Sequence, residues 1–117
     1  MNREETLRRT YQAFNDRDID AVLERVHPEV DWPNAWEGGR VVGRDAVRDY
    51  WTRQFAEISS TVEPESFTEE RDGAVTVHVH QVVRDANSGE LLTDSHVRHR
   101  YWFDENGLVT RMNVLDD

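Results

Sequence analysis

The first part of the chain carries apolar residues at helical spacing. Leu7, Tyr11 and Phe14 recur at intervals of four and three residues, which places their side chains on one face of an α-helix. Asn2 stands where a capping side chain is expected. The pattern therefore predicts an amphipathic helix over residues 2–15.

Two more helices are predicted downstream. Helical spacing resumes after a cap at Asp18, with apolar residues Ile19, Val22, Leu23 and Val26, and Pro28 is expected to end this second helix. A longer helix is predicted from Arg44 to Ile58, because its apolar stripe consists of Val47, Tyr50, Trp51, Phe55 and Ile58. Gln54 is the one polar member of that stripe.

The remaining segments have the composition of strands. Residues 30–36 are rich in β-branched and aromatic side chains, and Pro33 confines them to an edge or irregular strand. Four further strands are expected at residues 61–67, 74–83, 91–103 and 108–115. Turns around Gly73, Gly89 and Gly107 join these runs, so the last three should form an antiparallel meander.

Closing the hairpin at Asn87-Ser88-Gly89 fixes the predicted pairing of its strands. A three-residue loop sets Val79 opposite Val97 and His80 opposite His96. One face then carries Val77, Val79, Gln81, Val97, His99, Tyr101 and Phe103, and the other carries His78, His80, His96, Arg98, Arg100 and Trp102. Only the first is apolar enough to cover a core, so it should be the concave face.

Composition and charge narrow the possible partners. The 117 residues fit one domain, 1–117, with 37% hydrophobic and 32% charged residues, so apolar side chains must be concentrated inward. A net charge of -10 repels phosphate backbones and anionic lipid, which argues against nucleic-acid and membrane partners. There is no Cys and no apolar run of membrane-spanning length. A cytoplasmic protein is expected.

Local sequence signatures resemble those of a known superfamily. They are Tyr11-Gln12-Ala13-Phe14-Asn15, His27-Pro28-Glu29-Val30, Val42-Gly43-Arg44-Asp45-Ala46-Val47 and Phe103-Asp104-Glu105-Asn106-Gly107-Leu108-Val109. With the order of elements, they resemble the nuclear transport factor 2 superfamily, and specifically its SnoaL-like and ketosteroid isomerase-like domains. The resemblance implies an α+β, cone-shaped cystatin-like roll, in which three N-terminal helices pack on a curved, mostly antiparallel sheet and enclose a hydrophobic pocket. It also implies a homodimer through the convex sheet face.

Two catalytic patterns of this superfamily are incomplete here. His99 stands where ketosteroid isomerases are expected to place a buried acid, but Trp32 takes the place of their general base. Val79, Gln81 and Val114 occupy the positions of the Asp-Arg-Asp set of limonene-epoxide hydrolases, so the carboxylates that would activate water are missing.

The resemblance still places a set of polar and aromatic residues around the pocket. His99, Tyr101 and Asn34 are the candidate catalytic residues, because His99 could act as base or acid beside a carbonyl while Tyr101 or Asn34 holds the enolate oxygen. The expected ligand-binding residues are Trp32, Trp36, Tyr50, Trp51 and Gln81. The predicted partner is a small apolar or carbonyl-containing molecule, with no cofactor.

Several readings stay open at this point. An inward His beside a Tyr is often a hydrogen-bonded core pair, so the protein could be an isomerase or cyclase, a non-catalytic binding module for an apolar ligand, or a dimeric assembly domain. His78, His80 and His96 form the one metal-like cluster. Because Arg98 and Arg100 share that face and no carboxylate is expected near it, no metal is predicted.

Overall fold

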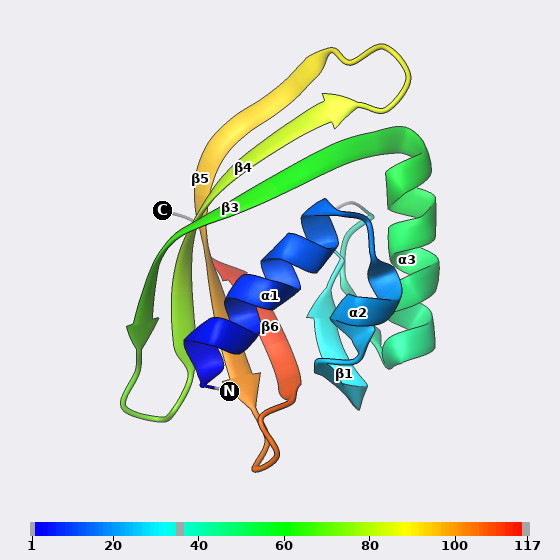
Figure 1. Ribbon diagram of the computed structural model, residues 1–117. Coiled ribbons are helices and arrows are strands. Elements are labelled where there is room, and N and C mark those ends of the chain that lie inside the picture. The colour runs from blue at the N-terminus through cyan, green and yellow to red at the C-terminus, as the bar shows by residue number, and fades with distance from the viewer. Residues whose placement is uncertain (1, 35–36, 116–117) are drawn as a thin grey trace.

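The computed structural model describes residues 2–34 and 37–115 and contains three helices and one sheet (Figure 1). The elements, in chain order, are α1 (Arg3–Asn15), α2 (Ile19–Leu23), β1 (Val26–Pro33), β2 (Arg40–Val42), α3 (Arg44–Glu57), β3 (Ile58–Glu69), β4 (Val75–Asp85), β5 (Leu91–Phe103) and β6 (Val109–Leu115). The strands are arranged in the order β2-β1-β6-β5-β4-β3. All neighbours are antiparallel except β1 and β6, which pair in parallel. The predicted α+β roll is confirmed.

The long strands bend around the helices. Figure 1 shows β3, β4 and β5 curving over α1, while α3 lies along the side of the molecule beside α2 and β1. The core lies between these layers and includes Leu7 of α1, Val47 of α3 and Val77 of β4, all at most 1% exposed. Burying such side chains contributes roughly 1.5–3 kcal/mol each, which holds the helices against the concave face.

The predicted strand register is confirmed. Val79 pairs with Val97 and His80 with His96. Alternation along the strands buries Val79, His99 and Tyr101 on the concave side. Their neighbours of opposite parity belong to the convex face, where His78 and His96 are exposed.

The end of the second helix was predicted wrongly. α2 stops at Leu23, and Val26 begins a strand that continues through Pro28. Val26 pairs in parallel with Val109, whose backbone N–H donates to the carbonyl of Arg25 at 3.0 Å. This long-range pairing outweighs the local helical spacing, since helix propensity is a weak preference that tertiary contacts override.

Two side chains at the end of α1 fasten the helix to the edge strand β3. The carboxamide of Asn15 donates to the backbone carbonyl of Val62 at 2.8 Å and accepts from its N–H at 2.9 Å. Arg17 donates to the carbonyl of Ser60 at 2.6 Å and lies over the ring of Phe55, 4.5 Å from its centroid. These contacts fix the position of α1 over the concave face.

Replacing Asn15 with Ala should destabilise the fold. The change leaves both partly buried backbone groups of Val62 without their partner, and we expect the free energy of unfolding to fall by about 1–3 kcal/mol. Urea unfolding measures the loss. Gln12→Ala, an exposed change on the same helix, is the control, and an equal effect of both substitutions would contradict the assignment.

Candidate functional site: a central cavity

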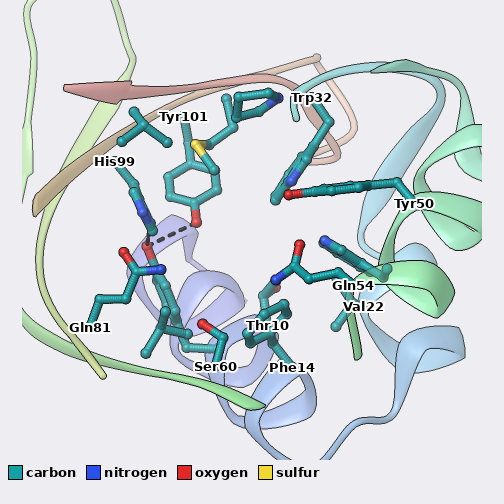
Figure 2. A pocket seen from close by; sticks show the side chains of 16 residues that line it. Thr10, Phe14, Val22, Trp32, Tyr50, Gln54, Ser60, Gln81, His99 and Tyr101 are labelled. Atoms are coloured by element: carbon teal, nitrogen blue, oxygen red, sulfur yellow. Dashed lines mark hydrogen bonds between the residues drawn. The ribbon is translucent and has the colours of Figure 1, made fainter. Parts of the chain in front are cut away.

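A cavity of about 120 Å³ lies between the helices and the concave face of the sheet (Figure 2). Its walls come from all three helices and from strands β1, β3, β4, β5 and β6. The lining residues are Thr10, Tyr11, Phe14, Val22, Trp32, Pro33, Tyr50, Trp51, Gln54, Ser60, Val62, Gln81, His99, Tyr101, Met112 and Val114. By volume the cavity is of the size that accommodates a single aromatic ring.

The described lining contains no Asp, Glu, Arg or Lys. The uncharged lining contrasts with the whole chain, in which 32% of the residues are charged. A buried ion without a counter-charge or hydrogen-bonding partners is strongly disfavoured. The cavity is therefore suited to an uncharged molecule.

Three polar side chains form a hydrogen-bonded chain along one wall. The Tyr101 hydroxyl donates to the Tyr11 hydroxyl at 2.8 Å, and the Tyr11 hydroxyl lies 2.8 Å from Nδ1 of His99. The Tyr11 hydroxyl thus accepts from Tyr101 and makes a second hydrogen bond with Nδ1, in which the tautomer of the imidazole decides which group donates. Figure 2 shows this chain linking the sheet to α1.

Burial keeps all three groups uncharged. Desolvation lowers the pKa of His99 to about 4 and raises the pKa of Tyr101 well above its usual value. The pKa of Tyr11 is also raised, first by burial and then by the neighbouring Tyr101. At neutral pH the wall thus offers a neutral imidazole and two protonated phenols.

Aromatic rings shape the opposite side of the cavity. Trp51 packs edge-on against Trp32 and against Phe14, with ring centroids 5.5 Å apart in both pairs. Tyr50 also lines this side. These predicted ligand-binding residues and Gln81 lie around the cavity, whereas the predicted Trp36 lies outside the described residues.

Of the three candidate catalytic residues, His99 and Tyr101 line the cavity and Asn34 does not. The Asn34 side chain donates to the carboxylate of Glu37 at 3.0 Å and accepts from the Glu37 backbone N–H at 2.7 Å. Asn34 therefore holds the turn that follows β1. Hydrogen bonds from Arg53 and from Asn34 lower the pKa of Glu37 to about 2.

Sequence reasoning missed four polar lining residues, which are Thr10, Tyr11, Gln54 and Ser60. Tyr11 and Thr10 belong to the buried face of α1, and their place in an amphipathic pattern gave no sign of which hydroxyl would reach His99. Ser60 lies on β3, one residue before the expected start of that strand. Only the pairing of β3 with β4 brings Ser60 to the cavity.

Two of the convex histidines, His80 and His96, are paired with carboxylates. His80 lies 2.6 Å from Asp94 and His96 lies 2.9 Å from Glu65, and the two imidazole rings stack with centroids 4.8 Å apart. The hydrogen bond to Asp94 raises the pKa of His80. The expectation that no carboxylate lies near this cluster was wrong. Among the described residues, no group of three or more His, Asp or Glu side chains is arranged to hold a metal ion.

Within the part of the chain that the structure describes, no helix is both long and apolar enough to cross a bilayer. All three helices contribute residues to the wall of the cavity.

Comparisons with known proteins place this architecture in a family. The profile of the SnoaL-like domain matches residues 7–112, and no curated protein matches the chain. A nuclear transport factor 2-like protein of unknown function from Burkholderia pseudomallei is 25% identical, with a TM-score of 0.84 over 100% of this chain and 92% of that one.

Two further solved structures share the fold. The protein TerC, co-crystallised with polyporic acid, is 24% identical, with a TM-score of 0.83 over 98% of this chain and 91% of TerC. SalBIII, an epoxide hydrolase/cyclase-like enzyme of pyran ring formation in the polyether salinomycin, is 19% identical, with a TM-score of 0.83 over 97% of this chain and 88% of SalBIII.

The buried imidazole should make stability depend on pH. The pKa of His99 is about 4 in the folded chain against 6.5 for an ordinary imidazole. Between these values the unfolded chain binds one more proton, so stability falls as the pH falls, by about 1.4 kcal/mol per pH unit. We expect the wild type to lose about 2 kcal/mol more than His99→Gln between pH 7 and pH 5.

Urea unfolding at both pH values measures this difference. The matched control is His78→Gln, which removes an imidazole from an exposed position on the convex face and should leave the pH dependence close to that of the wild type. An unchanged pH dependence in His99→Gln would show that His99 is not held neutral by burial.

Proposed function

Since the chain belongs to the SnoaL-like domain family, we propose that it binds a small, neutral, largely apolar molecule in the central cavity. The uncharged lining carries this proposal. A charged ligand would lose its hydration without gaining a counter-charge, whereas an apolar ligand gains from contact with the surrounding aromatic rings. The open volume between those rings favours a ligand site over an assembly domain whose aromatics fill its interior.

The Tyr101–Tyr11–His99 chain supplies the polar end of the proposed site. Its groups are held by buried strands and by α1 at hydrogen-bonding distance from one another. A pocket with mostly apolar walls and a few fixed polar groups binds by shape and orients the ligand by hydrogen bonds. TerC, with the same fold, was crystallised with the small molecule polyporic acid, and this supports a ligand-binding use of the cavity.

A second candidate function is isomerisation or cyclisation by proton transfer next to a carbonyl. The hydrogen-bonded His99 favours it, because neutral imidazole can take up a proton while a tyrosine hydroxyl stabilises the developing enolate oxygen. The cyclase-like enzyme SalBIII shares the fold. A pKa of about 4 makes His99 a weak base toward a carbon acid, so binding is the function that the geometry supports best.

Filling the cavity should abolish ligand binding without unfolding the protein. Ser60 is buried in the lining, and Ser60→Leu places a larger apolar side chain there. Titrating wild type and variant with a panel of neutral aromatic and alicyclic compounds, followed by the fluorescence of the lining residues Trp32 and Trp51, should show binding in the wild type and at least tenfold weaker binding in the variant.

The control is Ser66→Leu, the same change at an exposed position of the same strand. Equal affinities for Ser60→Leu and Ser66→Leu would place the ligand outside the cavity and contradict the proposal.

The proton-transfer candidate has a direct test. If His99 removes a proton next to a carbonyl, then cyclohexanone in deuterated water should exchange its α-hydrogens faster with the wild type than with His99→Gln. Removing the enolate-stabilising hydroxyl in Tyr101→Phe should slow exchange by roughly 10²-fold. NMR of the ketone measures the exchange rate. Identical rates with and without protein would exclude the proton-transfer candidate, and ligand binding would remain the proposed function.

A further inference from the structure

Gln54 interrupts the apolar face of α3. Its neighbours on that face, Tyr50, Trp51 and Val47, are all buried, and Gln54 itself is only 7% exposed. A carboxamide in this position loses its hydration, so its oxygen and nitrogen need hydrogen-bonding partners in the folded chain. An apolar side chain of the same length would pack there without that requirement.

The side-chain oxygen of Gln54 lacks such a partner. It is buried and accepts no hydrogen bond from any donor in the described part of the chain. The same side chain lines the cavity, and Figure 2 shows it pointing into the pocket from the side opposite His99 and Gln81. A buried, unpartnered acceptor on a side chain that lines a cavity is destabilising unless a bound molecule donates to it.

Three hydroxyl groups of the lining are hydrogen-bonded to other groups of the protein. Thr10 donates to the backbone carbonyl of Thr6 at 2.8 Å. Tyr101 donates to Tyr11, and the Tyr11 hydroxyl is hydrogen-bonded to Nδ1 of His99. None of these hydroxyl groups donates to Gln54, and neither does any other described donor of the lining, so a molecule bound in the cavity can supply the missing hydrogen.

We propose that Gln54 determines specificity, and that its side-chain oxygen accepts a hydrogen bond from a hydroxyl group of the ligand. The inference rests on the ligand-binding function proposed above and names the ligand class as neutral alcohols or phenols of about one ring. A site built around a buried hydrogen-bonding group discriminates strongly against an analogue that lacks the matching group, because the protein atom then stays unpaired. Among largely apolar molecules of equal shape, Gln54 thus favours those that carry a hydrogen-bond donor.

Phenol and toluene test this inference, because they share a ring and differ by a hydroxyl against a methyl group. Two-dimensional NMR titrations give both dissociation constants for the wild type and for Gln54→Met, which keeps the side-chain length and removes the acceptor. We expect the preference for phenol over toluene to fall by about tenfold in Gln54→Met, the value of one hydrogen bond. Gln12→Met, the same change at an exposed position, should keep the wild-type preference.

Anisole provides a readout that needs no variant. Its ether oxygen has no hydrogen to donate, so it should bind the wild type no better than toluene. If anisole matches phenol, or if Gln54→Met keeps the wild-type preference while both probes still bind, the role of Gln54 is overturned and the binding function stands. If neither phenol nor toluene binds the wild type at millimolar concentrations, the binding function fails and this inference fails with it.

Discussion

The pairing of β4 with β5 is the constraint on which the cavity depends. Successive side chains of a strand point to opposite faces of the sheet. The pairing of Val79 with Val97 therefore determines the face to which each of the remaining side chains of the hairpin points. A shift of β5 by one residue would carry His99 and Tyr101 to the convex side and bring His96 and Arg98 under the helices. The hydrophobic effect opposes such a shift, because it would expose the buried ring of Tyr101 and bury ionisable side chains.

The fold also separates charge from the interior. The chain carries a net charge of -10, yet the described cavity lining holds no Asp, Glu, Arg or Lys. Many charged side chains are instead paired with one another, as Asp31 is with Arg40 and Arg111. Inside, burial holds His99 neutral and both tyrosines protonated. The uncharged interior follows mainly from desolvation, to which the neighbouring Tyr101 adds at Tyr11. A low-dielectric pocket of this kind strengthens the few hydrogen bonds that a ligand can make there.

Sequence reasoning was most successful where one periodic pattern determined the structure. The helix predicted from Arg44 to Ile58 and the strand predicted at residues 91–103 agree with α3 and β5, because one side-chain period runs through each segment. It failed at Val26, whose conformation depends on pairing with the distant β6. The cavity itself was less predictable. Alternation indicated that His99 faces inward, but its contact with Tyr11 joins residues 88 positions apart, and Asn34 was assigned to the pocket although it closes a turn.

The attachment of α1 to β3 has a consequence for how the protein can associate. β3 is an outer strand of the sheet, and unpaired backbone groups on such a strand can recruit a strand from another molecule. Asn15 and Arg17 occupy those groups at Ser60 and Val62, and Pro64 lies at an irregularity in the pairing just beyond them. The edge of β3 between Ser60 and Pro64 is therefore not available for pairing with a strand of another molecule. This disfavours fibre-like self-assembly through that part of β3.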